Sequence, residues 1–110
     1  MTTPIGLAAE DAAVYGYGII LAGSDASIIG AVRRELAAHR ARRDAAEQLW
    51  PDAAPAPVGY LTGADTSTAP VLLAIRIESD CCEAWRAELG FASDSETRRF
   101  CLDALTASAI

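Results

Sequence analysis

Apolar residues recur at alternating steps of three and four along most of the chain, which is the period of an amphipathic helix. Gly23, Pro51 and Gly90 interrupt this period with residues that end helices. Ser93, followed three residues later by Glu96, has the spacing of a capping box at the start of a last helix. The pattern therefore predicts four helices, over residues of about 4–22, 25–50, 69–89 and 94–109.

The segment 51–68 has no helical period and contains three prolines and two glycines, so we expect a crossing loop there. The connections after the first and third helices are short. Two antiparallel hairpins joined by a long crossover is one of the standard four-helix-bundle connectivities. The sequence predicts an all-α protein, a single domain over residues 1–110 folded as an antiparallel four-helix bundle. The alternative is a three-helix array with a frayed last segment.

The apolar stripes of three helices contain four polar side chains, Glu10, His39, Arg43 and Glu78. A charged group buried without a partner costs several kcal/mol, so charges in such stripes should pair with one another or with a metal. Antiparallel packing brings Glu10 opposite the turn that holds His39 and Arg43. We therefore predict a buried polar cluster of these four residues. The stripes are Glu10, Val14, Tyr17 and Leu21; Ile29, Val32, Leu36, His39, Arg43, Ala46 and Trp50; and Val71, Ile75, Glu78, Cys82, Trp85 and Leu89.

Each of the four residues also has an ordinary interpretation. Glu10 can be a solvated carboxylate near the helix start, favoured by the helix dipole. Glu78 can be solvated as well, and Arg43 can extend outward along its aliphatic stem. His39, the only histidine of the chain, can be a satisfied core or boundary residue rather than a ligand.

Composition excludes several classes of function. The chain has a formal net charge of −6 and contains arginine but no lysine, which disfavours binding to nucleic acid or to an anionic membrane. The apolar amino-terminal segment lacks a basic start and contains Glu10 and Asp11, so we expect neither a secretion signal nor a membrane span. The odd set Cys81, Cys82 and Cys101 has no C-x-x-C spacing, which predicts reduced thiols and a cytoplasmic protein.

Three motifs carry a resemblance to a known family: "AAEDAAVYGYG" (8–18), "AHRARRD" (38–44) and "IESDCCEAWR" (77–86). With them the chain resembles an uncharacterised alanine-rich family of the ferritin-like superfamily, known from high-GC bacteria. Where that family often has a Glu-His pair, this sequence has Glu10 and Asp11. Its last helix also stops earlier, at Ile110, than the family leads us to expect.

The resemblance implies a di-iron site, which takes a Glu from each of two helices and a Glu-x-x-His from each of the other two. This chain does not supply that set. Glu35 and His39 are four residues apart rather than three, and Glu96 is followed by Arg99 where a histidine is required. We therefore expect no metal and no cofactor, with Arg43 standing where a cation would neutralise Glu10 and Glu78.

Three functions compete at this point. The first is a non-enzymatic module that forms a homodimer or binds a protein partner, with small residues repeating from Ala12 to Gly16 and from Gly18 to Ala22 as a close-packing surface. The second is a single-metal or redox protein whose ligands are Glu10, His39 and Glu78, with Cys82 as a further candidate. The third, nucleic-acid binding, is disfavoured because the arginines of the second helix point around most of it. No catalytic motif nominates a reaction.

Overall fold

The computed structural model describes residues 3–57 and 69–109, and over these ranges the chain is helical with no strand. The prediction of an all-α protein with four helices is confirmed. Residues 58–68 of the predicted crossing loop lie outside the described ranges. The helices are α1 (Ile5–Ala22), α2 (Ile29–Leu49), α3 (Pro70–Phe91) and α4 (Ser95–Ala109).

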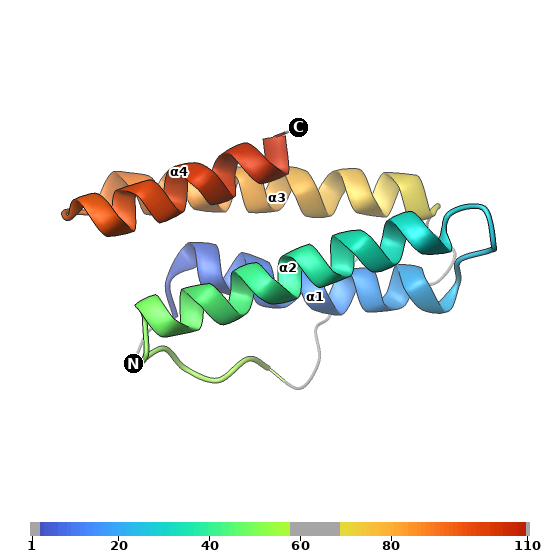
Figure 1. Cartoon of the computed structure of the whole chain (residues 1–110), viewed down its shortest axis with the longest axis horizontal. Helices are drawn as coiled ribbons and strands as arrows, with labels where there is room; N and C mark the ends of the chain where they lie inside the picture. Colours follow the sequence, from blue (N-terminus) through green and yellow to red (C-terminus); the bar gives the residue numbers. More distant parts are fainter. Residues whose placement is uncertain (1–2, 58–68, 110) are drawn as a thin grey trace.

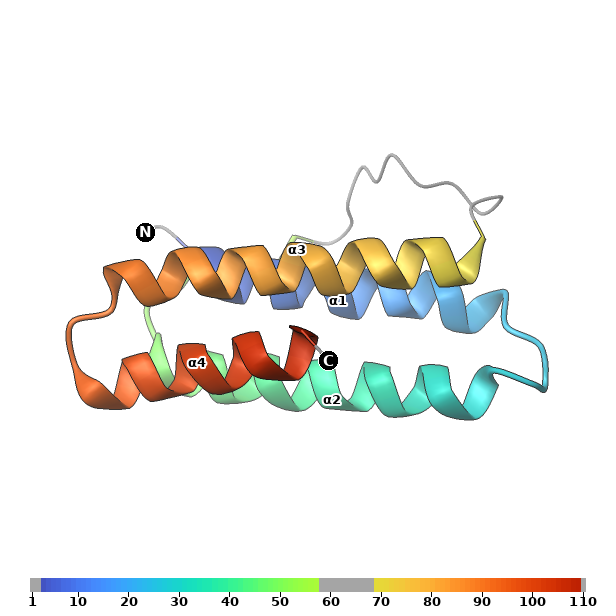
Figure 2. The same cartoon turned by 90° about the horizontal axis from the view of Figure 1, so that it is seen from above.

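The helices form two antiparallel hairpins, α1 with α2 and α3 with α4, which lie side by side (Figure 1). The long connection between α2 and α3 makes these two helices run in the same direction. In the turned view α1 and α3 form one layer, and α2 and α4 form the other (Figure 2). The closest packing is between α1 and α2, between α1 and α3, and between α3 and α4. The last segment is therefore a packed helix and not the frayed end of a three-helix array.

Two helix ends differ from the sequence prediction. The second helix begins at Ile29 rather than near residue 25, because the Asp25 carboxylate accepts hydrogen bonds from the Ser27 backbone N–H at 2.9 Å and from its hydroxyl at 2.5 Å. These bonds form a local turn that competes with the helix. The third helix runs through Gly90 and ends at Phe91, so Gly90 is an interior position and not a cap.

The start of α4 is capped by Asp94 and not by the predicted pair of Ser93 and Glu96. The Thr97 backbone N–H donates to Asp94 Oδ1 at 2.7 Å, and the Thr97 hydroxyl donates to Oδ2 at 3.0 Å. Asp94 and Thr97 are three residues apart, as are Ser93 and Glu96 of the predicted capping box, and each lies one residue later in the sequence. An aspartate accepts from the first-turn N–H groups at least as well as a serine does.

The core side of α3 is rotated relative to the predicted stripe. Leu73, Ile77 and Cys81 are buried, whereas Val71 and Ile75 of the predicted stripe are exposed. The two sets lie roughly 140° apart around the helix. The buried set belongs to the layer shared with α1, and α4 runs along only the later turns of α3 (Figure 2). The helix is thus apolar on two sides, and the sequence period does not say which side has a complete partner.

α1 is long and apolar enough to span a membrane by length and composition. In the bundle it is the helix that contacts both α2 and α3. Its buried side chains include Leu7, Tyr17 and Ile20 together with two carboxylates, Glu10 and Asp11. One side of this helix therefore forms part of the core.

Candidate functional site

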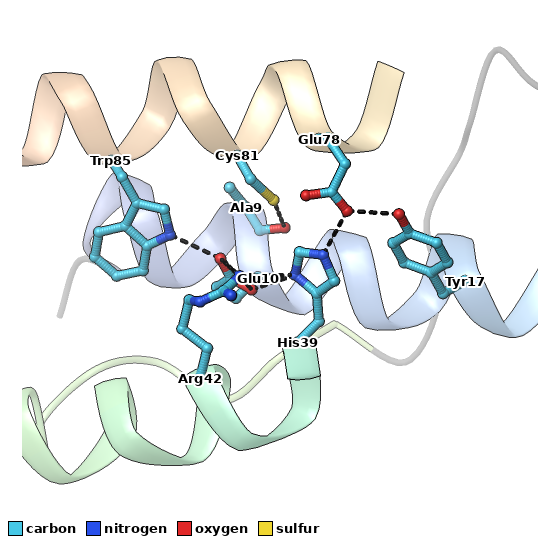
Figure 3. Close-up of polar contacts among 8 residues, drawn as sticks. All are labelled: Ala9, Glu10, Tyr17, His39, Arg42, Glu78, Cys81 and Trp85. Atoms are coloured by element: carbon cyan, nitrogen blue, oxygen red, sulfur yellow. Dashed lines mark hydrogen bonds and ion pairs between the residues drawn. The ribbon is translucent and has the colours of Figure 1, made fainter. Parts of the chain in front are cut away.

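The centre of the bundle contains a polar cluster built around His39 (Figure 3). The imidazole comes from the middle of α2 and is 1% exposed. Its Nδ1 lies 2.6 Å from Glu10 Oε1 on α1, and its Nε2 lies 2.7 Å from Glu78 Oε2 on α3. The ring stacks on Tyr17 with centroids 5.2 Å apart. The predicted meeting of Glu10, His39 and Glu78 is what the structure shows.

Glu10 is fully buried, and hydrogen-bond donors reach both oxygens of its carboxylate. Trp85 Nε1–H donates to Oε2 at 2.7 Å, and Arg42 Nη1 lies 3.4 Å from both carboxylate oxygens. With the bond to His39, donors from α2 and α3 converge on one carboxylate of α1. Such convergence offsets the cost of removing the charge from water.

A glycine makes room for the indole that reaches Glu10. A Cβ at Gly6 would lie 2.3 Å from the ring of Trp85, which is closer than carbon atoms can approach. The Gly6 backbone N–H also donates to Glu88 Oε1 at 3.2 Å. The absence of a side chain at this position therefore allows α1 and the end of α3 to approach each other.

Glu78 forms the outer edge of the cluster, since its side chain is 24% exposed. The Tyr17 hydroxyl donates to Glu78 Oε2 at 2.5 Å, on the same oxygen that faces His39. Burial raises the pKa of Glu78, but hydrogen bonds from His39 and Tyr17 outweigh this and hold it below its usual value. Burial together with the bond to Glu78 raises the pKa of Tyr17, so the phenol keeps its proton.

The contacts of His39 define its protonation state. Both ring nitrogens face carboxylate oxygens, which accept hydrogen bonds when ionised and so favour a proton on each nitrogen. Arg42 Nη1 also lies 3.3 Å from Nδ1. Burial lowers the pKa of His39, but the bonds to Glu10 and Glu78 outweigh burial and raise it to about 9. An imidazolium and the Arg42 guanidinium then balance the two carboxylates.

Arg43, which we predicted in the cluster, is outside it. Its Nε and Nη2 donate to Asp44 Oδ1 at 3.1 and 3.0 Å, and Nε lies 3.8 Å from Glu47 Oε1. Arg42 takes the predicted place beside Glu10. Positions three and four residues after His39 are on the same side of a helix, so the spacing alone does not distinguish them. In the structure the step of three is the one that faces Glu10.

The geometry also changes the possible metal ligands. Glu10 and Glu78 lie on opposite nitrogens of one imidazole, so they do not share a single ion with His39. Two other sets have ligand atoms within 4.8 Å of one another. One is Glu10, His39 and Cys81, and the other is Glu35, His39 and Glu78. The cysteine next to the cluster is therefore Cys81, whose thiol donates to Ala9 O at 3.6 Å, and not Cys82.

The sequence analysis missed the polar roles of two aromatic residues and of Arg42. Tyr17 and Trp85 were placed on the apolar stripes, where they were counted as hydrophobic. Buried tyrosine and tryptophan usually find a partner for the O–H or N–H. Glu10 and Glu78 lie on the same stripes and need donors. This tendency therefore identifies Tyr17 and Trp85 as donors to them.

Comparisons with known proteins agree with this architecture. The model of a domain of unknown function, DUF4439, matches residues 3–110, and the chain belongs to this family. It is similar to the crystal structure of a conserved hypothetical protein from Mycobacterium tuberculosis, with 37% sequence identity and a TM-score of 0.87. That similarity covers 94% of this chain and 83% of the other. The search of curated proteins gives no match.

Proposed function

We propose that this member of the DUF4439 family is a non-enzymatic, ferritin-like helical module of the cytoplasm with a metal-free polar cluster, and that it acts by self-association. The proposal that the cluster is metal-free rests on the two carboxylates beside His39. Glu10 Oε1 lies 2.6 Å from Nδ1, and Glu78 Oε2 lies 2.7 Å from Nε2. A metal ion would have to replace one of the two protons. Histidine binds metals as the neutral ring, whereas this environment favours the charged one.

The ferritin-like assignment is supported by connectivity and by the place of the cluster. Ferritin-like bundles have one long crossover, and this chain has its long connection between α2 and α3 (Figure 1). In that superfamily the metal ligands project into the bundle core from facing helices. Glu10, His39 and Glu78 project inward from three helices in the same manner. The two positive side chains, His39 and Arg42, take the place of the cation.

The role we propose for the cluster is to fix the relative positions of the helices. Buried ionic groups contribute little net stability on average, but each ion here has partners only in one register of α1, α2 and α3. The experiment is a nitrogen-15 NMR spectrum of the His39 ring at pH 7. We expect both ring nitrogens to carry protons, and a neutral ring would overturn the proposal.

Self-association is supported by an apolar patch on the first turns of α3. Val71, Leu72 and Ile75 are 65%, 64% and 57% exposed. They precede the part of α3 that α4 covers, because α4 has 15 residues and α3 has 22. An exposed group of large apolar side chains is a common mark of an interface. We propose that a second copy of the chain covers this patch.

The predicted close-packing surface on α1 supports self-association less well. Gly16 is buried, and a Cβ there would lie 2.7 Å from Ile77 Cδ1, so this glycine serves the packing of α1 on α3. A Cβ at Gly18 would meet no atom within 4 Å. Light scattering at high protein concentration tests the dimer. We expect Ile75→Glu to shift the equilibrium to monomer and Leu102→Glu, on α4, to leave it unchanged, while a strict monomer in the unchanged chain would remove this part of the proposal.

A second candidate function is a single-metal protein, favoured by the set Glu35, His39 and Glu78. Two carboxylates and a histidine suit a divalent transition metal, and Glu10 on Nδ1 would orient the ring as carboxylates do behind metal-bound histidines. Metal analysis of protein purified without a histidine tag, after addition of iron, manganese or zinc, distinguishes the two candidates. One equivalent of metal that is lost in Glu35→Gln would establish the second.

A further inference from the structure

A cavity separate from the polar cluster lies at the other side of α1. Its volume is about 530 Å³, and it is enclosed by the first turns of α1, the end of α2 and the segment that follows Trp50. Volumes of this size are typical of small-molecule sites. Leu7, Trp50, Pro51 and Ala53 provide apolar walls, and Asp11 and Glu47 are the two acidic residues that line the cavity.

Asp11 is the unusual member of this lining. It is only 7% exposed, and no donor in the described part of the chain reaches its Oδ1. Burial raises the pKa of this carboxyl, the charges of Glu47 and Glu10 raise it further, and Arg43 acts in the opposite direction. The Arg43 guanidinium donates instead to Asp44 and lies near Glu47. A carboxylate oxygen that is removed from water and has no hydrogen-bond donor is costly to the free protein.

The central cluster does not account for Asp11. Glu10 points into the bundle toward His39 and Trp85 (Figure 3), and its oxygens are engaged there. Successive residues of a helix point roughly 100° apart, so the next side chain faces away from that cluster and toward the end of α2. The cavity that Asp11 lines shares none of its residues with the cluster.

We propose that this cavity binds a small organic cation, a primary ammonium with a short apolar body. The ammonium pairs with the carboxylate of Asp11, which lines the cavity, and neutralises its charge. The apolar body lies against Leu7, Trp50 and the proline and alanine side chains. An anion is disfavoured because Asp11 and Glu47 both face the cavity.

A metal ion is the less suitable occupant. Asp11 belongs to no cluster of three or more metal-ligating side chains in the described residues. One buried carboxylate and one exposed carboxylate leave most coordination positions of a calcium or magnesium ion to water, whereas such ions take six or more oxygen ligands. The apolar walls also favour a ligand with carbon atoms over a hydrated ion.

The test is an NMR titration of the full chain at pH 7 with benzylammonium, benzyl alcohol, benzoate and magnesium as probes. Benzylammonium should shift the signals of Trp50, Ala53 and Ala54 saturably, with a Kd of about 1 mM for so small a ligand. Benzyl alcohol and benzoate should bind at least ten times more weakly. Equal binding of the alcohol, stronger binding of magnesium, or shifts confined to other helices would overturn the proposal, as would no binding.

Variants connect the binding to the carboxylate. Asp11→Asn keeps the shape of the side chain and removes its charge, so affinity for benzylammonium should fall at least tenfold. Asp80→Asn, which removes an exposed carboxylate from α3, is the matched control and should bind as the unchanged chain does. A thermal unfolding curve for Asp11→Asn shows that the variant is folded. Unchanged affinity in that folded variant would refute the role of Asp11. None of these readouts depends on self-association or on the state of His39.

Discussion

Glu10 and Asp11 are neighbours on α1, both are buried, and their surroundings are opposite. Glu10 is 0% exposed and has donors from His39, Arg42 and Trp85. Asp11 is 7% exposed, and in the described part of the chain its Oδ1 has no donor. Because successive residues of a helix point in different directions, Glu10 faces the other helices and bonds to two of them, whereas Asp11 lines a cavity. Burial alone therefore does not identify the role of an acidic residue; its donors do.

The largest effect should come from removing the satisfied carboxylate. Glu10→Ala leaves the charges of His39 and Arg42 and the Trp85 N–H without their acceptor. Breaking a buried ion pair by removing one partner typically lowers the free energy of unfolding by about 3–5 kcal/mol. Urea denaturation of the variant beside the unchanged chain measures this loss.

The control for Glu10→Ala is Glu83→Ala, an exposed position of α3. Substitutions at such sites usually change stability by no more than about 0.5 kcal/mol. If the two variants lost similar, small amounts of stability, Glu10 would not be the centre of the cluster, and the contrast with Asp11 would disappear.

The next effect is a pH dependence that comes from His39. Its pKa is raised to about 9 in the folded chain, above the ordinary value of about 6.5. A histidine whose pKa is raised on folding stabilises the folded state. This stabilisation is complete at pH values below the pKa of the unfolded chain, and it is lost as pH rises through the pKa of the folded chain. The free energy of unfolding should therefore fall by roughly 3 kcal/mol between pH 6.5 and pH 9.

Equilibrium unfolding at half-unit pH steps tests this dependence, with His39→Gln as the comparison. The glutamine cannot titrate, so the decline from this site should be absent even if the variant is less stable at every pH. The lowered pKa of Glu78 acts at the acidic side, where stability should fall as pH falls below about 4.5. A flat profile from pH 6.5 to 9 in the unchanged chain would contradict the charged state of His39.

A smaller effect should follow from pushing Trp85 away from Glu10. Gly6→Ala places a Cβ against the Trp85 ring, where an ideal atom would be 2.3 Å away. Overpacking of this kind costs about 1–3 kcal/mol. Gly18→Ala is the matched control, because a Cβ there meets no atom within 4 Å and alanine is the better helix former. Thermal unfolding should show a loss for the first variant and a small gain for the second.

The sequence predicts the architecture well and the orientation of side chains less well. Four helices follow from the spacing of apolar residues and from Pro51 and the glycine signals. The core side of α3 was not predictable in this way, because Val71 and Ile75 continue an apolar stripe that α4 covers only in part (Figure 2). Periodicity reports which side of a helix is apolar, and the length of the neighbouring helix decides which part is buried.

The site was predictable as far as its three central residues. Glu10, His39 and Glu78 were identified because charged groups in apolar stripes need partners. Arg42 was not, since steps of three and four from His39 point to the same side, and only the packing of α1 on α2 distinguishes them. Asp11 was interpreted as a charge that interrupts the apolar amino-terminal segment and as a departure from the Glu-His pair of the family that the chain resembles. Its burial depends on the path of the chain after Trp50, which sequence spacing does not give.

The smallest effect, opposite in sign to that of Glu10→Ala, should come from Asp11→Asn. Removing a buried charge that has no donor relieves the cost of its burial, so the free energy of unfolding at pH 7 should rise by about 1 kcal/mol. The gain should vanish as pH falls and the carboxyl of the unchanged chain becomes protonated, since its pKa is raised by burial. Urea denaturation at pH 7 and pH 4 measures both values. A loss of stability at pH 7 would mean that Asp11 has a donor in the folded protein, and its difference from Glu10 would then be one of degree.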